Sequence, residues 1–350
     1  MSRGGDTLAE KIWYGESSFR MLLLPFTWIY AVVTACRRYL YSSGVLRTYQ
    51  VFAPVIVVGN ITAGGTGKTP ITMWLAEQLA ERGYKPGIIS RGYRGSVGPQ
   101  PVLVSADSDP AVVGDEAVLM ASRSECPVVV HPDRVAAANV AIELGADLII
   151  SDDGLQHYRL GRDFEIAVVD GARLYGNRQL LPAGPLREPL SRLNTIDQIL
   201  VQRETSDSSE LIHRTADSPP KNFRLAASAI RRLDDSDIRN FVDFSGTTVH
   251  ALAGIGNPER FFRLLEAYDI RVIPHPLGDH ADIKPQDFEF DDDRDVVMTE
   301  KDAVKCRRLD ASKAWYVPVD VLIDDADVEF MLKRILRKID RHVSDSMTLD

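Results

Sequence analysis

Short apolar runs alternate with segments of helical periodicity from about residue 50 onwards. Residues 55–58, 147–150 and 166–169 are nearly continuous apolar runs, which is typical of strands buried on both faces of a sheet. Residues 71–81 and 134–144 lie between such runs and have apolar positions at helical spacing. This alternation predicts an α/β protein whose parallel sheet is covered by helices on both faces.

A polar stretch rich in Pro and Ser, residues 204–222, interrupts the pattern and predicts an exposed linker. A shorter alternation of strands and helices follows it and predicts a second, smaller α/β domain. We therefore expect an N-terminal segment over residues 1–50, a core over residues 51–215, the smaller domain over residues 216–340 and a polar tail over residues 341–350.

The most apolar run of the chain, residues 21–36, lies between Arg20 and the pair Arg37-Arg38. Sixteen helical residues span about 24 Å, whereas a bilayer core is about 30 Å thick. The first 50 residues carry a net charge of +3, although the whole chain carries −9. Aromatic residues and basic flanks predict a membrane-associated helix that lies on the surface or inserts shallowly. The alternative is a helix that packs against the rest of the protein.

Composition narrows the class of protein. Of the 350 residues, 45 % are hydrophobic and 26 % charged, which are ordinary globular values and exclude a disordered chain. The three cysteines are far apart and form no disulfide framework, as expected in a reducing compartment. The acidic net charge excludes a nucleic-acid coat protein.

The strongest chemical signal is the segment GNITAGGTGKTP at residues 59–70, which follows an apolar strand and precedes a helix, as a P-loop does. Its amides would cradle phosphates, Lys68 would neutralise them, and the Thr69 hydroxyl would bind Mg²⁺. The usual P-loop spacing places Gly at position 62, where this chain has Thr62. The alternative is a glycine-rich turn that binds nothing. The residues predicted to bind the nucleotide are Thr62, Ala63, Gly64, Gly65, Thr66, Gly67, Lys68 and Thr69.

A second signal is the pair Asp152 and Asp153, which ends a short apolar run. Ligands of open α/β sheets bind at the carboxyl ends of the strands, so we expect this pair near the P-loop. The predicted Mg²⁺ ligands are Thr69, Asp152 and Asp153, and the sequence leaves open which aspartate touches the metal. The alternative is an Asp-Asp-Gly turn without chemistry.

An ordered set of further motifs makes the sequence resemble the tetraacyldisaccharide 4′-kinase (lipid A 4′-kinase) family, from about residue 10 to 340. Besides the P-loop, the motifs are Ser90-Arg-Gly-Tyr93, Gly114-Asp-Glu116, His131-Pro-Asp-Arg134, Asp152-Asp-Gly-Leu-Gln-His157, Leu181-Pro-Ala-Gly-Pro-Leu-Arg-Glu-Pro189, Gly254-Ile-Gly-Asn-Pro258, Asp279-His280 and Thr299-Glu-Lys-Asp302.

The resemblance implies an ATP- and Mg²⁺-dependent kinase. Its acceptor would be the 4′-hydroxyl of a tetraacylated glucosamine disaccharide 1-phosphate at the cytoplasmic face of the bacterial inner membrane. The implied partners are this glycolipid and the membrane surface, with no nucleic acid and no obligate protein partner. ATP rather than GTP rests on the resemblance, because no base-reading motif is visible.

The resemblance also implies catalytic roles. Asp115 would be the general base, paired with His280 of the Asp279-His280 motif, and Arg134 would contact phosphate. Arg187 and Glu188 would bind substrate or close the site. The alternatives from the residues alone are a helix N-cap for Asp115, a structural histidine for His280, a surface arginine for Arg134 and an ion pair for Arg187 and Glu188. Three consecutive aspartates at residues 291–293 suggest a solvated loop rather than a metal cluster.

Two other functions stay open on sequence grounds. One is another P-loop enzyme, such as a soluble small-molecule kinase or an ATP-dependent ligase. The other is a membrane-recruited NTPase that acts as a switch without phosphorylating a product. A whole second domain and a candidate base far from the P-loop in sequence favour the kinase.

Overall fold

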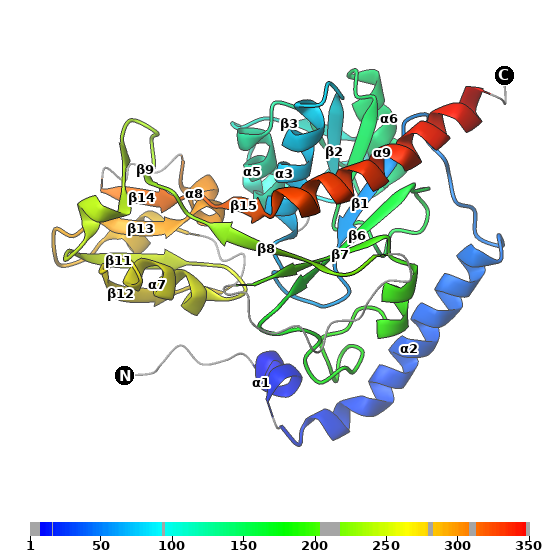
Figure 1. The fold of residues 1–350 in the computed structure, drawn as a ribbon. Helices are drawn as coiled ribbons and strands as arrows, with labels where there is room; N and C mark the ends of the chain where they lie inside the picture. Colours follow the sequence, from blue (N-terminus) through cyan, green and yellow to red (C-terminus); the bar gives the residue numbers. More distant parts are fainter. Residues whose placement is uncertain are drawn as a thin grey trace.

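The computed structural model describes residues 8–15, 17–92, 95–203, 218–278, 283–307 and 313–347, with side chains as far as His342. The described strands form two sheets, one of nine strands and one of six (Figure 1). The larger sheet belongs to the domain that carries the P-loop, and the smaller sheet lies beside it on the left of Figure 1.

The large sheet is parallel except at its two edges. From β8 to β4 each described pair of neighbours is parallel, whereas β15 and β3 at the edges are antiparallel. The predicted parallel sheet is therefore confirmed. The strands in spatial order are β15 (Asp320–Ile323), β8 (Lys221–Ala226), β7 (Gln198–Gln202), β6 (Phe164–Asp170), β1 (Val55–Gly59), β5 (Leu148–Asp152), β2 (Pro86–Ser90), β4 (Val128–Val130) and β3 (Val102–Val104).

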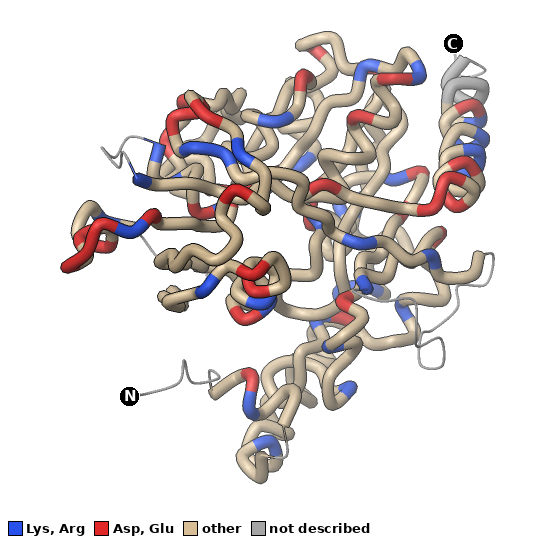
Figure 2. The backbone as a smooth tube through the Cα atoms, turned by 60° about the vertical axis from the view of Figure 1, so that its left-hand side comes forward, with Lys and Arg blue, Asp and Glu red and all other residues tan. Residues whose placement is uncertain are grey.

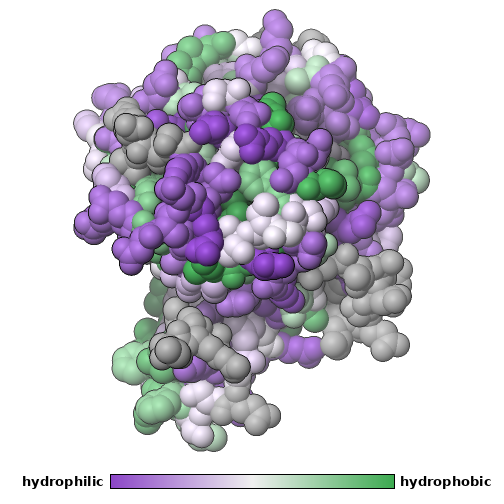
Figure 3. Space-filling model, turned by 90° about the vertical axis from the view of Figure 1, so that its left-hand side faces the viewer, coloured by the Kyte–Doolittle hydropathy of each residue, from purple (hydrophilic) through white to green (hydrophobic). Residues whose placement is uncertain are grey.

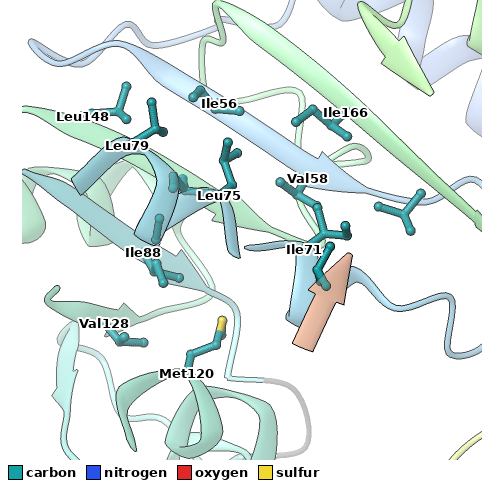
Figure 4. Packing of buried hydrophobic residues seen from close by; sticks show 14 of the residues in the cluster. Ile56, Val58, Ile71, Leu75, Leu79, Ile88, Met120, Val128, Leu148 and Ile166 are labelled. Atoms are coloured by element: carbon teal, nitrogen blue, oxygen red, sulfur yellow. The ribbon is translucent and has the colours of Figure 1, made fainter. Parts of the chain in front are cut away.

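Alternate residues of the central strand β1 serve two hydrophobic cores. Ile56 and Val58 pack with α3 (Lys68–Ala80), α5 (Asp115–Arg123) and α9 (Asp325–Met347) on one face, as the side chains in Figure 4 show for α3 and α5. Val55 and Val57 pack on the opposite face, which α6 (Arg134–Glu143) and the 3₁₀ helix η1 (Leu190–Thr195) cover. The period of two residues along a strand produces this division. A one-turn helix, α4 (Pro110–Val113), leads into α5.

The small sheet has its own core, which includes Phe241, Phe262 and Trp315. Its described strands in spatial order are β10 (Ile238–Arg239), β9 (Ile230–Arg232), β14 (Ala314–Val317), β13 (Val296–Thr299), β11 (Thr248–Ala253) and β12 (Arg271–Pro276). The described helices of this domain are α7 (Pro258–Glu266), α8 (Glu300–Cys306), and the 3₁₀ helices η2 (Phe241–Phe244) and η3 (Pro285–Phe288).

The boundaries of the small domain differ from the prediction at both ends. Strands β8 and β15, predicted in the small domain, pair with each other at the edge of the large sheet. Helix α9 also returns to the large domain, because Met331, Leu332 and Ile335 are fully buried in its core. The helix continues to Met347, so residues 341–347 are helical rather than a loose tail. Most of the predicted linker, residues 204–217, lies outside the described residues.

Two N-terminal helices, α1 (Leu8–Tyr14) and α2 (Arg20–Ser42), lie along the lower edge of the large domain (Figure 1). The Trp13 indole donates a hydrogen bond to the Pro182 carbonyl at 2.9 Å, and the Thr27 hydroxyl donates to the Leu180 carbonyl at 3.3 Å. None of the described helices combines the length and the continuous hydrophobicity that a membrane span requires.

The outer face of α2 is apolar and exposed. The backbone of the N-terminal helices is mostly free of charged residues in Figure 2, and hydrophobic side chains gather on the lower lobe of the molecule in Figure 3. Eight large hydrophobic side chains of α2 are more than half exposed: Met21, Leu22, Phe26, Trp28, Ile29, Val32, Val33 and Tyr39. Water-exposed patches of this kind mark surfaces that contact another molecule or a membrane.

Candidate active site

One cavity of about 1360 Å³ lies between the large and small domains. The large domain contributes the P-loop and the carboxyl ends of the strands, and the small domain contributes side chains that include Asn257, Arg260 and Lys301. Trp13, Tyr30 and Arg37 of the N-terminal helices line the same cavity. The cavity is therefore lined by three of the four predicted parts of the molecule, the N-terminal segment, the core and the small domain.

The P-loop connects β1 to α3 and leaves its middle open to the cavity. Gly67 caps α3 with φ +82°, and Gly64 has φ +108°, a left-handed conformation that favours glycine. The Asn60 side-chain amide holds the loop from inside, because it donates to the Gly64 carbonyl at 3.3 Å and to the Thr66 hydroxyl at 3.2 Å. A Cβ atom at Gly64 or Gly65 would meet nothing within 4 Å, so a phosphate can approach the backbone here.

Thr62 occupies a different environment from the rest of the predicted nucleotide loop. Residues 63–69 line the cavity, whereas Thr62 is buried and forms a β-bridge with Leu186. The adjoining backbone continues this pairing, because the Ala63 amide donates to the Pro185 carbonyl at 2.7 Å and the Arg187 amide donates to the Ile61 carbonyl at 2.7 Å. A β-branched residue suits such extended pairing, which accounts for threonine where P-loops usually have glycine.

Asp153 lies between two cations at the edge of the sheet. Its carboxylate accepts hydrogen bonds from Arg187 Nη1 at 3.0 and 3.1 Å, and Lys68 Nζ lies 3.7 Å from Asp153 Oδ1. Burial alone would raise the pKa of Asp153, but Lys68 and Arg187 outweigh it and hold that pKa at about 2. The carboxylate is therefore ionised at physiological pH, next to the P-loop lysine.

The neighbouring Asp152 is in a different electrostatic state. Its side chain is almost fully buried, and Oδ1 accepts a hydrogen bond from the Thr72 hydroxyl at 3.0 Å. Burial, together with the charges of Glu116 and Asp153, raises the pKa of Asp152 to about 7. The two adjacent carboxyls thus differ widely in proton affinity.

Arg134 is buried, so the surface-arginine alternative is wrong. Its Nη1 atom donates to the Ser151 hydroxyl at 2.9 Å and to the Asp152 carbonyl at 2.5 Å, and Nη2 donates to the Asp153 carbonyl at 3.3 Å. The guanidinium also lines the cavity. It therefore supports the backbone of the aspartate pair and presents positive charge beneath the site.

Asp115 is the first residue of α5 and only 7 % exposed. The preceding Gly114 is the N-cap, so the alternative role of Asp115 as the N-cap residue is wrong. Asp115 Oδ1 accepts a hydrogen bond from the Glu116 amide at 2.9 Å, and Oδ2 lies 3.8 and 4.0 Å from the ammonium groups of Lys305 and Lys301. The motif Asp279-His280 lies outside the described residues.

Arg187 and Glu188, adjacent in sequence, have different surroundings. Arg187 lines the cavity and binds Asp153, whereas Glu188 is buried and accepts a hydrogen bond from the Tyr158 hydroxyl. Arg192 Nε lies 3.5 Å from Glu188 Oε2, and burial raises the pKa of Glu188. Glu188 therefore belongs to a buried polar network with Tyr158 and Arg192, and the ion pairs formed here are Arg187 with Asp153 and Glu188 with Arg192.

A family model described as tetraacyldisaccharide-1-P 4′-kinase matches residues 19–337. The chain belongs to the tetraacyldisaccharide-1-P 4′-kinase family. The resemblance found in the motifs is thereby confirmed. Membership in a family of phosphotransferases favours the kinase interpretation over a ligase or a switch.

Individual relatives of this member of the tetraacyldisaccharide-1-P 4′-kinase family support the match over most of the chain. A tetraacyldisaccharide 4′-kinase of Nitrosococcus oceani is 45 % identical over 317 residues, which cover 90 % of both chains. One of Alkalilimnicola ehrlichii is 47 % identical over 307 residues, 88 % of this chain and 90 % of the relative. The crystal structure of LpxK from Aquifex aeolicus in complex with ATP superposes with a TM-score of 0.76 at 29 % identity, and the match covers 92 % of this chain and 99 % of that one.

The candidate site also contains residues that were assigned no role from the sequence. Glu116 and Lys301 line the cavity and form an ion pair at 3.0 Å. The Thr299 hydroxyl caps α8 by accepting a hydrogen bond from the Asp302 amide, and this cap signal was visible in the Thr299-Glu-Lys-Asp302 motif. Two lysines four positions apart on a short helix, Lys301 and Lys305, must lie on one face.

The oxygen ligands expected for Mg²⁺ in this member of the family are present in the lining of the cavity. Thr69, Asp152 and Asp153 line it, and hydroxyl and carboxylate oxygens suit this cation. Within the described part of the chain no group of three or more His, Cys, Asp and Glu residues could hold a metal. The arrangement fits Mg²⁺ that is completed by phosphate oxygens and water, as is usual for kinases, rather than a site built by protein alone.

Proposed function

We propose that the protein transfers the γ-phosphate of ATP to the 4′-hydroxyl of a tetraacylated glucosamine disaccharide 1-phosphate, forming the 1,4′-bisphosphate, at the cytoplasmic face of the bacterial inner membrane. The observation that carries the proposal is the shared cavity. It brings the P-loop, the Asp152–Asp153 pair and the N-terminal helices together in a chain whose relatives are named tetraacyldisaccharide 4′-kinases.

The large domain binds and orients the phosphate donor in this proposal. The amides of residues 64–67 face the triphosphate, and Lys68 neutralises charge that builds up during transfer. Thr69, Asp152 and Asp153 would hold Mg²⁺, which when bound neutralises phosphate oxygens. Arg134 fixes the backbone carbonyls of both aspartates and so keeps this edge of the sheet rigid.

Asp115 accepts the proton of the acceptor hydroxyl in this proposal, together with His280. A carboxylate near the cavity suits this role because phosphoryl transfer needs an oriented acceptor more than covalent chemistry. Cavity-lining Glu116 follows Asp115 directly in α5. His280, from the small domain, would approach when the domains close over the site.

The exposed apolar face of α2 supports a membrane-bound acceptor. Leu22, Trp28 and Ile29 are each at least 62 % exposed, and the basic residues of the N-terminal segment match an anionic lipid surface. Trp13, Tyr30 and Arg37 line the cavity from the same helices. A lipid held at this face would therefore have its sugar head group next to the phosphate site.

The test is mass spectrometry of the disaccharide 1-phosphate lipid after incubation in detergent with the full chain, ATP and Mg²⁺. We expect the gain of one phosphate at the 4′ position. Lys68→Ala should abolish the gain, and Asp115→Ala should reduce turnover by roughly 10²-fold, the usual scale for a general base. Lys333→Ala, on the exposed side of α9, is the control and should leave turnover unchanged. Hydrolysis of ATP without a phosphorylated lipid would contradict the proposal.

A further inference from the structure

Two ammonium groups of the small domain converge on one oxygen of Asp115. Lys305 Nζ lies 3.8 Å and Lys301 Nζ 4.0 Å from Asp115 Oδ2. The side chain of Lys305 is 11 % exposed, that of Lys301 17 % and that of Asp115 8 %, so solvent screens these charges little. Ion pairs on the surface contribute little to the free energy of unfolding. When a pair is buried to this degree, removal of one partner leaves an uncompensated buried charge and destabilises the protein.

Helix α8 holds both lysines in place. Its Asp302 is fully buried, accepts hydrogen bonds from the Gly254 amide at 2.8 Å and the Thr299 hydroxyl at 2.6 Å, and lies 3.1 Å from Lys305 Nζ. Lys301 makes a second ion pair, at 3.0 Å, with Glu116. The charged groups around Asp115 therefore include Glu116 on its own helix, and Lys301, Lys305 and Asp302 on α8.

The contact between α5 and α8 joins the two domains beside the cavity. At the other end of α5, Arg123 binds Glu300 at 3.2 Å and Asp320 at 2.5 Å. Helix α5 thus has one ion-pair cluster at its first residue, Asp115, and a second cluster at its last residue, Arg123. The ion pairs of Arg123 with Glu300 and Asp320 do not involve Asp115. This separation lets domain docking be distinguished from a direct effect on the Asp115 carboxylate.

We propose that Lys301 and Lys305 are positioning residues for Asp115. Docking of the small domain places two positive charges beside Asp115 Oδ2, which fixes the position of the carboxylate next to the cavity-lining Glu116. The amide of Glu116 holds Oδ1. The general base is then complete only when the small domain is docked on α5. This inference rests on the proposed function, in which Asp115 is the base.

A double-mutant cycle on kcat tests the proposal. Lys305→Met should lower kcat for phosphorylation of the lipid by about 10-fold or more and leave the KM for ATP within about 2-fold. In an Asp115→Asn background the same substitution should have little further effect, because the group that it positions is gone. Lys301→Met should behave in the same way, and Lys305→Arg should restore most of kcat because it retains the charge.

Arg123→Gln is the matched control. It weakens the same contact between domains without removing a charge from Asp115, so its effect on kcat should add to that of Asp115→Asn. If Lys305→Met is also additive with Asp115→Asn, or lowers kcat no more than Arg123→Gln does, the lysines are structural and the proposal is wrong.

A cycle on the thermal midpoint, with the same Asp115 and Lys305 variants, separates this inference from the proposed function. If the two substitutions are coupled in thermal unfolding while the wild-type protein phosphorylates no lipid, the contact exists and the proposed function is wrong. An active wild type with additive effects on kcat would overturn the inference alone. Each variant is first compared with wild type by near-UV circular dichroism, and Lys301→Met keeps the test open if Lys305→Met does not fold.

Discussion

The Tyr30 hydroxyl donates a hydrogen bond to the main-chain carbonyl of Arg187, with 3.0 Å between the two oxygens. The amide of the same Arg187 donates to the Ile61 carbonyl at the start of the P-loop, and its guanidinium holds Asp153. One residue therefore links helix α2, the P-loop and the carboxylate beside Lys68.

Replacing Arg187 by Gln should weaken nucleotide binding without unfolding the protein. Asp153 would lose two charge-assisted hydrogen bonds and leave Lys68 as its nearest cation, so Lys68 would be drawn away from phosphate. Both side chains are partly exposed, so we expect a loss of roughly 10-fold in kcat/KM for ATP, or about 1.4 kcal/mol, rather than a complete loss. Steady-state kinetics with ATP as the varied substrate measures this loss.

Arg178→Gln is the control, because Arg178 is an exposed arginine nearby in the chain and its replacement should leave kcat/KM for ATP unchanged. Equal losses in the two variants would exclude the Asp153 contact as the cause.

Gly67→Ala should lower both stability and nucleotide affinity. Gly67 has φ +82°, and a Cβ there would lie 3.3 Å from Gln202 Oε1 and from the Phe223 ring. A left-handed alanine costs about 1–2 kcal/mol before these contacts are counted. Thermal unfolding and ATP titration measure the two effects. Gly65→Ala is the control for stability, because its Cβ meets nothing within 4 Å and its φ is ordinary. A thermal midpoint as low for Gly65→Ala as for Gly67→Ala would show that the backbone conformation is not the cause.

Local patterns in the sequence were sufficient to predict the part of the site that is built from contiguous residues. An apolar strand, a glycine-rich turn and a helix follow one another, so β1, the P-loop and α3 could be predicted from neighbouring residues alone. The Asp152–Asp153 pair followed from a similar rule, because the ends of parallel strands meet at one edge of a sheet.

Features that depend on long-range pairing were not predictable in this way. Lys301 meets Glu116 across 185 positions, and nothing near either residue identifies the other. The deviation at Thr62 has its explanation in Leu186, on a separate loop. The return of β15 and α9 to the large sheet likewise depends on which core buries Val321 and Met331, and apolar periodicity alone does not reveal that.

The pKa of Asp152 predicts that Asp152→Asn stabilises the metal-free protein at high pH. A folded-state pKa of about 7 lies above the unfolded value of about 3.9. The native state therefore binds more protons between these values, and stability falls as the pH rises through 7. Asparagine carries no charge to bury, so we expect the thermal midpoint of the variant to exceed that of wild type by roughly 3 °C at pH 8 and to differ little from it at pH 4.

Differential scanning calorimetry in the presence of a chelator measures this difference. Glu289→Gln, which removes an exposed carboxylate, serves as the control and should leave the midpoint unchanged at both pH values. Asp153 contributes in the opposite sense, because its pKa of about 2 gives stability that is lost as the pH falls towards 2, below the range of this comparison. A gain in midpoint of equal size at pH 4 and pH 8 would contradict an origin in the charge of Asp152.

Substitution of the exposed face of α2 should release the protein from membranes while leaving the phosphate site intact. Trp28 and Ile29 are 72 and 62 % exposed, and burial of each large apolar side chain in a lipid interface contributes about 1.5–3 kcal/mol. The double variant Trp28→Ser, Ile29→Ser should therefore bind vesicles of anionic lipid at least about 100-fold more weakly in a flotation assay. ATP binding should be unchanged, because neither side chain lines the cavity.

The matched variant Ile238→Ser, Val242→Ser removes exposed apolar surface from the small domain and should bind vesicles as wild type does. If both variants lose binding equally, hydrophobicity in general rather than α2 explains the attachment, and if neither does, this face does not contact the membrane.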